Sequence, residues 1–323
     1  MGRRRRSRTD GQPDLEGVLV VDKPAGMTSH DVVQVVRRAA GQHRVGHTGT
    51  LDPDATGVLV CCLGRATKLV TALQAGRKTY AATMVLGRET TTQDGAGEVV
   101  READASGIDE HALCVALTRF QGTIEQVPPM VSAVRVDGER LHEKARRGEV
   151  VEREPRRVTV HELVLEDFVP GPQAEASFLV TCSAGTYVRT LAADVGAELG
   201  VGGSLASLRR IANGHFTVDT AVTLDEVRAA GDEGRLGSLL VPPRDAVRGL
   251  PEVEVIDPDD LLALTQGKRL PAFGVAGVGE RYVVVSGDRL VGVYRDRDGR
   301  AESELVWLRP EELAAPPASG SEA

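Results

Sequence analysis

The stretch Gly46-His-Thr-Gly-Thr-Leu-Asp-Pro-Asp-Ala-Thr-Gly-Val-Leu59 joins a glycine-rich loop to the first residues of an apolar strand. Its glycines permit backbone conformations that other residues avoid, and Pro53 restricts the chain directly after Asp52. Rigid loops on a scaffold of strands and helices often carry catalytic groups. Asp52 or Asp54 is therefore a candidate catalytic carboxylate. The alternative is an Asx turn, in which the side chain only accepts hydrogen bonds from nearby backbone N–H groups.

Strands and helices are predicted on both sides of this loop. Short apolar runs bounded by turn residues predict strands, and they lie at 17–21, 57–63, 80–86, 158–168 and 176–183. Spaced apolar residues after polar N-terminal residues predict helices, and these lie at 28–39, 66–74, 109–119 and 190–199. A further short helix is predicted to carry Leu208, Arg209 and Arg210.

The pattern changes near Pro251. Residues 252–308 hold short apolar runs separated by turn signals, with a helix predicted only near 258–266. This pattern predicts a small separate β domain. Residues 1–13 and the tail after Pro310 are rich in charged or small polar residues, which predicts that both tails are disordered.

The composition is typical of a globular protein of about two domains. The chain has 323 residues, of which 41% are hydrophobic and 27% charged, and its net charge is −8. This negative charge argues weakly against a nucleic-acid partner, but Lys and Arg gather in the first residues and again in 135–157. The basic clusters form either a stripe that binds nucleic acid or a solvated face of mixed charge.

The cysteines indicate a reducing compartment. They stand at 61, 62, 114 and 182, without the paired spacing of a zinc site or a disulfide framework. No apolar run approaches the roughly 20 residues that a transmembrane helix needs, and the basic N-terminus lacks the apolar segment of a secretory signal. The expected location is the cytoplasm, without a membrane partner.

Two further residues are candidates for a site around the loop. A carboxylate that is shielded from water needs a cationic partner to stay ionised, and Arg189, after the turn at Gly185, is a candidate partner. Tyr80 follows Arg77 and Lys78, a combination that suits a nucleic-acid base stacked between a ring and a cation. The alternative is that the Tyr80 ring only fills the core. The sequence holds no phosphate-loop, dinucleotide or zinc-protease motif, so no bound cofactor or metal is expected.

Six sequence blocks occur in a fixed order. They are Gly17-Val-Leu-Val-Val-Asp-Lys-Pro-Ala-Gly-Met-Thr-Ser29, Val45-Gly-His-Thr-Gly-Thr-Leu-Asp-Pro53 with Ala55-Thr-Gly-Val-Leu59, Leu63-Gly-Arg-Ala-Thr-Lys68, Lys78-Thr-Tyr80, Gln126-Val-Pro-Pro129 and Cys182-Ser-Ala-Gly-Thr-Tyr-Val-Arg-Thr190. Together these blocks resemble the TruB family of tRNA pseudouridine synthases. The block around Asp52 is the most specific of them.

The resemblance implies that the chain isomerises uridine 55 in the T-loop of tRNA to pseudouridine. The base is flipped out of the RNA, and an aspartate-dependent reaction breaks and re-forms the glycosidic bond without a cofactor or a metal. The catalytic aspartate of the family falls on Asp52, not on Asp54.

The resemblance also implies which residues bind the substrate. Tyr80 stacks on the target base, and Arg189 pairs with the Asp52 carboxylate. Tyr187 and Leu208 line the pocket, while His47 enters the T-loop and helps to hold the base out.

The fold implied by the resemblance is α+β, the pseudouridine synthase fold. It has a mixed, mostly antiparallel central sheet flanked by helices and loops, and a small C-terminal PUA-like β-barrel domain. The expected catalytic domain spans 14–250 and the PUA-like RNA-binding domain 251–310, between disordered tails at 1–13 and 311–323. The expected partner is tRNA, bound by a monomer through the T-arm, with the acceptor stem as a second contact.

Two other functions stay open as alternatives. One is a tRNA-binding folding chaperone in which catalysis is secondary. The other is a guide-RNA-dependent synthase that works within a complex. The compact chain, without long lysine-rich extensions, favours an enzyme that works alone.

Overall fold

The computed structural model describes residues 14–132, 135–136, 139–140, 147, 149, 151–277 and 279–313. The predicted tail at 1–13 and most of the tail after Pro310 lie outside these residues. The start of the C-terminal tail is ordered, because residues Pro310–Glu312 form a 3-10 turn and Glu312 pairs with Arg65 at 3.0 Å.

Ten of the described strands form one mixed, mostly antiparallel sheet. Its order is β14-β1-β3-β12-β4-β11-β10-β7, with β2 paired to β3 and β13 paired to β12. The strands are β1 (Gly17–Lys23), β2 (Val45–His47), β3 (Thr56–Leu63), β4 (Lys78–Leu86), β7 (Gly122–Gln126), β10 (Arg156–Val169), β11 (Glu175–Cys182), β12 (Gly203–Asn213), β13 (Phe216–Thr217) and β14 (Val222–Thr223). Strands β1 and β3 carry continuous apolar runs because both of their faces are buried.

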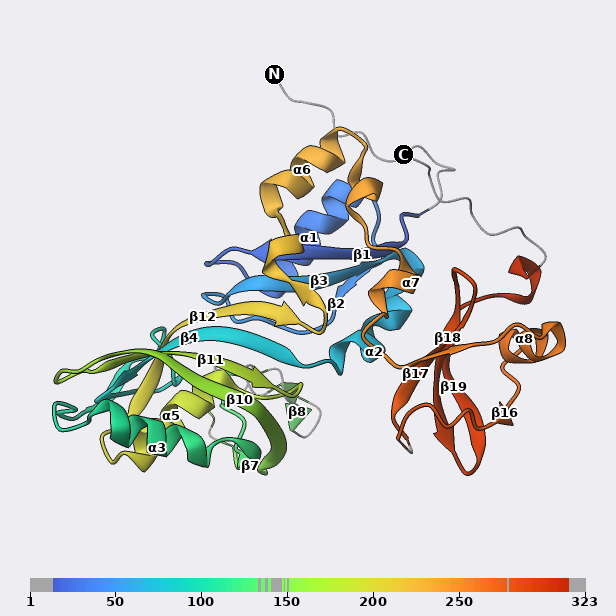
Figure 1. Ribbon diagram of the computed structural model, residues 1–323. Coiled ribbons are helices and arrows are strands. Elements are labelled where there is room, and N and C mark those ends of the chain that lie inside the picture. The colour runs from blue at the N-terminus through green and yellow to red at the C-terminus, as the bar shows by residue number, and fades with distance from the viewer. Residues whose placement is uncertain are drawn as a thin grey trace, which may run out of the picture.

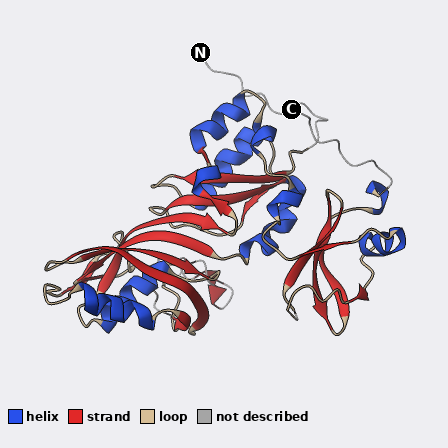
Figure 2. Ribbon diagram, in the orientation of Figure 1, coloured by secondary structure: helices blue, strands red, loops and turns tan. Residues whose placement is uncertain are grey.

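Helices cover this sheet in two groups (Figures 1 and 2). The first group is α1 (Ser29–Ala40) and α6 (Leu224–Asp232), which share a core cluster with β1 and β3. The second group is α3 (Glu110–Arg119) and α5 (Val188–Glu198), which share another cluster with β4, β10 and β11. Helix α1 begins with a capping box formed by Thr28 and Asp31. No helix in the described ranges is long and apolar enough to cross a membrane.

The remaining elements beside the central sheet are short. They are the hairpin strands β5 (Arg88–Thr90) and β6 (Val99–Glu102), the pair β8 (Arg135–Val136) and β9 (Glu139–Arg140), and the helices α2 (Val70–Gln74) and α7 (Pro243–Ala246). Residues predicted as one helix at 66–74 form a 3-10 turn, Gly64–Leu69, followed by α2.

The predicted helix around Leu208, Arg209 and Arg210 is wrong, since these residues lie within β12. Strand β12 fills the centre of the sheet, where it pairs with β4 along most of its length and with β3 near Arg210. These pairings are made with segments far away in the sequence, and they override the local preference of the residues. Leu208 therefore lies beside β4, and Arg210 lies between β4 and β3, next to the loop that carries Asp52.

The C-terminal residues form a second, curled sheet of five described strands in the order β15-β17-β18-β19-β16. These are β15 (Glu252–Glu254), β16 (Leu270–Pro271), β17 (Arg281–Ser286), β18 (Arg289–Arg297) and β19 (Arg300–Val306), with α8 (Pro258–Thr265) beside them. The short strands and the single longer helix agree with the pattern predicted for this region.

A shared apolar cluster attaches the second sheet to the first. Val283, Val293 and Trp307 pack in the same cluster as Val18 and Val60 of the central sheet. Helices α2 and α7 lie between the two sheets (Figure 1), and both contribute to this cluster. The C-terminal sheet is therefore held against the central sheet by buried apolar surface.

Candidate active site

Asp52 lies on a loop that is anchored by a buried lysine. Residues 48–55, called here the Asp52 loop, connect β2 to β3. Lys23, at the end of β1, donates from Nζ to the carbonyl oxygens of Pro53 at 2.8 Å and Ala55 at 2.6 Å. Burial lowers the pKa of Lys23 to about 8, and the charges of Asp54 and Asp52 oppose this shift. Lys23 therefore holds the second half of the loop in place.

Arg189 binds the Asp52 carboxylate with two of its nitrogens. Nε lies 3.0 Å from Oδ2, and Nη2 donates to Oδ1 at 3.4 Å. Only 4% of the Arg189 side chain is exposed, whereas 39% of the Asp52 side chain is exposed. Backbone carbonyls of Thr92 and Val131 accept further hydrogen bonds from Arg189 at 3.0 and 2.9 Å. The guanidinium is thus fixed from several sides, and the carboxylate that it holds faces the solvent.

A second carboxylate, which the sequence analysis missed, also binds Arg189. Oδ2 of Asp94 lies 3.1 Å from Nη1 of Arg189. Asp94 sits in the turn after β5, where Gln93 has a left-handed φ of 63°. Thr190 of α5 donates to the Gln93 side chain at 2.9 Å, which ties this turn to the helix that carries Arg189. In the sequence, Asp94-Gly95 signals only a turn, since a contact with a distant arginine leaves no local pattern.

The environment of Asp52 shifts its pKa in both directions. Burial raises the pKa of Asp52 above its usual value, the Arg189 charge opposes that effect, and the Asp94 charge adds to it. A carboxylate with a raised pKa is a better base and nucleophile than an ordinary one once it is ionised. The paired arginine keeps the ionised form accessible.

Other predicted site residues lie on β4, on β12 and at the start of α5, and they are buried to different degrees. Tyr80, on β4, is 6% exposed and belongs to the same core cluster as Leu51 of the loop, so its ring is largely covered. Leu208 packs against that cluster from β12. Tyr187 precedes α5, and its backbone exchanges two hydrogen bonds with the side chain of Gln126, at 3.0 and 3.2 Å.

His47 lies at the other end of the loop, as the last residue of β2. Its Nδ1 accepts a hydrogen bond from the Gly49 N–H at 3.3 Å. Burial lowers the pKa of His47, and the charge of Arg210 lowers it further. The neutral ring is therefore favoured at physiological pH. The structure groups Asp52, Arg189 and Asp94 in direct contact, with His47 at the edge of the same loop.

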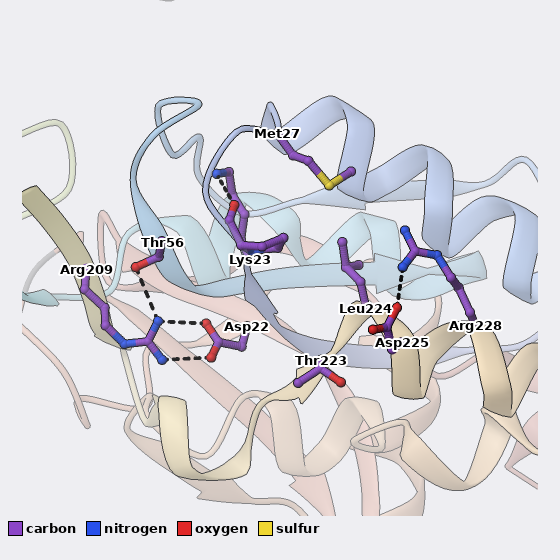
Figure 3. A pocket seen from close by; sticks show the side chains of 10 residues that line it. Asp22, Lys23, Met27, Thr56, Arg209, Thr223, Leu224, Asp225 and Arg228 are labelled. Atoms are coloured by element: carbon purple, nitrogen blue, oxygen red, sulfur yellow. Dashed lines mark hydrogen bonds and ion pairs between the residues drawn. The ribbon is translucent and has the colours of Figure 1, made fainter. Parts of the chain in front are cut away.

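A hollow of about 320 Å³ lies beside Lys23 (Figure 3). It is lined by Asp22, Lys23, Pro24, Met27, Thr56, Arg209, Thr223, Leu224, Asp225 and Arg228. Its two arginines already pair with carboxylates of the lining, since Arg209 binds Asp22 at 2.7 Å and Arg228 binds Asp225 at 2.6 Å. Asp52 does not line this hollow, although Lys23, which anchors the Asp52 loop, does. Within the described ranges, no group of three or more His, Cys, Asp or Glu residues could hold a metal ion.

Comparison with known families gives two adjacent matches. Residues 37–188 match the model of the TruB family pseudouridylate synthase N-terminal domain. Residues 189–248 match that of the tRNA pseudouridylate synthase B C-terminal domain. The first match contains Asp52, Tyr80, Asp94 and Tyr187, and the second begins at Arg189.

Curated relatives are similar over most of the chain. The tRNA pseudouridine synthase B of Symbiobacterium thermophilum is 52% identical over 250 residues, which cover 77% of this chain and 82% of the relative. The tRNA pseudouridine synthase B of Thermobifida fusca is 43% identical over 298 residues, which cover 90% of this chain and 98% of the relative. Among solved structures, a Cbf5-Nop10-Gar1 complex contains a chain with a TM-score of 0.71 and 27% identity, over 93% of this chain and 88% of that one.

Proposed function

Since this chain belongs to the TruB family of pseudouridylate synthases and is a tRNA pseudouridine synthase, we propose that its substrate is uridine 55 in the T-loop of tRNA. The observation that carries the proposal is the Asp52 carboxylate, which is held by a buried arginine on an anchored loop and open to solvent. The resemblance of its sequence block to the family supports Asp52 as the catalytic carboxylate.

The proposed reaction begins when the target uridine leaves the RNA stack. A base in folded RNA is out of reach, and flipping it costs a few kcal/mol. Stacking on an aromatic ring returns about 1–3 kcal/mol, and Tyr80 is the proposed ring. Because only 6% of Tyr80 is exposed, stacking requires side chains around the ring to shift when RNA binds. Tyr187 and Leu208 then line the pocket, and His47 holds the base out of the loop.

Asp52 then acts on the flipped nucleotide as a nucleophile or a base. The bond from N1 of uracil to C1′ of the sugar breaks, and a bond from C5 to C1′ forms. The proton of C5 leaves to solvent, and N1 takes up a proton. The reaction is an isomerisation, so no oxidant, reductant or group donor is consumed. Arg189 keeps the carboxylate ionised and correctly oriented until it reacts.

The C-terminal sheet is proposed to contact the acceptor stem while the T-arm occupies the site. Its support is the apolar cluster shared with the central sheet, which holds the C-terminal sheet beside the domain that carries Asp52. We propose further that the enzyme works as a monomer in the cytoplasm. The names of the relatives favour a tRNA substrate over the guide-RNA alternative, and they do not favour the chaperone alternative.

The test uses an unmodified tRNA transcript with tritium at C5 of its uridines. The intact protein is expected to release about one equivalent of tritium per tRNA, and a transcript with cytidine at position 55 is expected to release none. Asp52→Asn should abolish release, while the matched control Asp54→Asn, two residues along the same loop, should retain it. Release that survives in Asp52→Asn, or that persists without uridine 55, would contradict the proposal.

A further inference from the structure

Buried side chains hold alternate carbonyl groups of the Asp52 loop. The carbonyl oxygen of Gly49 accepts from Arg210 at 3.1 Å, and that of Leu51 accepts from Ser29 at 3.1 Å. The next two in the series, at residues 53 and 55, accept from Lys23. The donors come from β12, α1 and β1, and all of them are buried. The backbone on both sides of Asp52 is therefore fixed from three directions.

Arg210 holds the first half of this loop by bridging it to a strand. Its Nη2 binds the Gly49 carbonyl, while its Nε donates to the carbonyl oxygen of Val58 in β3 at 2.7 Å. The side chain is 1% exposed. One planar guanidinium thus joins the loop to β3, a geometry that a single ammonium group does not reproduce.

The backbone of Arg210 is itself fixed by close packing against β3. A Cβ atom at Gly57 would lie 2.2 Å from the Arg210 carbonyl oxygen, so only glycine allows the two strands to approach this closely. Three residues further along β12, the side-chain amide of Asn213 donates to Thr48 at 3.0 Å in a buried position. Side chains of β12 therefore bind Thr48 and Gly49, the first two residues of the Asp52 loop.

We propose that Arg210 is a positioning residue for the isomerisation, which fixes the first half of the Asp52 loop so that the carboxylate meets the flipped nucleotide. The inference rests on the proposed function of Asp52. Arg210 does not bind the carboxylate, whose partner is Arg189; it holds the loop backbone, and its side chain also interacts with that of Tyr80. Misplacing a catalytic group by about 1 Å can slow a reaction about 100-fold.

The first experiment compares single-turnover tritium release by the intact protein, Arg210→Met and Arg209→Met. Arg209 is the matched control, because it is the adjacent arginine of β12. It pairs with Asp22 and donates to the Thr56 side chain, whereas Arg210 binds the Gly49 carbonyl within the Asp52 loop. Arg210→Met is expected to lower the rate constant about 100-fold, with tRNA affinity and the final amplitude close to those of the intact protein. Arg209→Met is expected to keep the rate constant. A normal rate constant in Arg210→Met, including one with a reduced amplitude from misfolded protein, would overturn the proposal.

Two further measurements separate positioning from other effects. Arg210→Lys keeps the charge but can reach only one of the two carbonyls, so an intermediate rate constant is expected, and a full one contradicts the bridge. The acid limb of the pH–rate profile, which Asp52 sets, should not move, since the charges that shift the pKa of Asp52 belong to Arg189, Asp94, Lys23 and Asp54.

Hydrogen exchange tests whether Arg210 fixes the Asp52 loop, independently of any activity on tRNA. Amide exchange in a peptide covering 46–55 should speed up at least about tenfold in Arg210→Met, while peptides from β18 should be unchanged. Unchanged exchange in the loop would show that Arg210 does not fix it, whichever reaction the protein catalyses. If the intact protein releases no tritium but loop exchange is faster in Arg210→Met, the proposed function is wrong and the role of Arg210 in fixing the loop stands.

Discussion

Arg189 binds Asp52 through Nε and Nη2, at 3.0 and 3.4 Å, and the same guanidinium reaches Asp94 through Nη1 at 3.1 Å. One buried cation therefore serves two carboxylates, of which Asp52 is the more exposed. Such a group fixes the direction of the Asp52 side chain as well as its charge. Asp94 draws on the same cation, so it moderates how strongly Arg189 stabilises ionised Asp52.

Arg189→Lys is expected to slow tritium release about 100-fold or more, although the charge is kept. A lysine ammonium is a point charge that cannot bind Asp52, Asp94 and two backbone carbonyls at once. Single-turnover tritium release measures the effect, and filter binding measures the affinity for tRNA. A variant that keeps the rate constant of the intact protein would show that the forked geometry is not needed.

Asp94→Asn is expected to move the acid limb of the pH–rate profile to lower pH. The Asp94 charge raises the pKa of Asp52, so its removal lowers that pKa. With ionised Asp52 as the reactive form, the rate falls as the pH drops through the pKa of Asp52. In Asp94→Asn this fall is therefore expected at a lower pH than in the intact protein. Asparagine keeps an oxygen that can accept from Thr92 and Ala96 as Asp94 does.

The matched control for this shift is Asp225→Asn. Asp225 also pairs with an arginine, Arg228, but on α6, and it is not among the charges that shift the pKa of Asp52. Its profile should coincide with that of the intact protein. An acid limb that moves to higher pH in Asp94→Asn would show that the Asp94 charge does not act on Asp52 in this way.

The sequence predicted the parts of the site that lie in specific blocks. Asp52 and Arg189 stand in blocks that resemble the family, and the structure brings the two into contact. Asp94 was not predicted, because a turn sequence does not report which distant cation its carboxylate meets. The residue pattern alone left the role of the Tyr80 ring open between the core and a stacking surface, and the resemblance implied stacking. In the structure the ring is buried.

The fold was predicted best where the apolar pattern is local. Strands β1 and β3 were predicted from their apolar runs, and α1 from its capping residues. Strand β12 was missed around Arg210, since its conformation depends on pairing with β3 and β4. The contacts that anchor the Asp52 loop are side chain to backbone over long sequence separations, a kind of contact that leaves no periodic pattern.

Lys78→Met is expected to change how stability depends on pH. Burial lowers the pKa of Lys78 from 10.5 to about 8, and the charge of Arg210 adds to that shift. Between pH 8 and 10.5 the unfolded chain binds the proton more tightly than the folded chain, so Lys78 makes the free energy of unfolding rise with pH. Its cost to the folded state is full below pH 8 and is relieved above it.

The free energy of unfolding of the intact protein, relative to that of Lys78→Met, should therefore rise by about 2 kcal/mol between pH 7 and pH 9.5. Urea unfolding at several pH values measures both proteins. The comparison cancels the effect of other groups that titrate in this range, such as the buried cysteines. A constant or shrinking difference would mean that Lys78 keeps an ordinary pKa in the folded chain.

Arg65→Ala is expected to loosen the C-terminal sheet. The Arg65 guanidinium lies 4.5 Å from the centroid of the Trp307 ring and pairs with Glu16 at 3.2 Å and Glu312 at 3.0 Å. A partly buried cation–π contact with two ion pairs stabilises the fold by about 1–3 kcal/mol. Trp307 is the single tryptophan of the chain, so its emission reports on this junction alone.

In Arg65→Ala the Trp307 emission should shift to longer wavelength, because the ring, 7% exposed in the intact protein, gains contact with water. The urea midpoint should fall in parallel. Arg248→Ala is the matched control, since Arg248 forms an exposed ion pair with Asp245 three residues earlier, and such pairs contribute little. If the emission and the midpoint of Arg65→Ala equal those of the control, the apolar cluster holds the C-terminal sheet without help from Arg65.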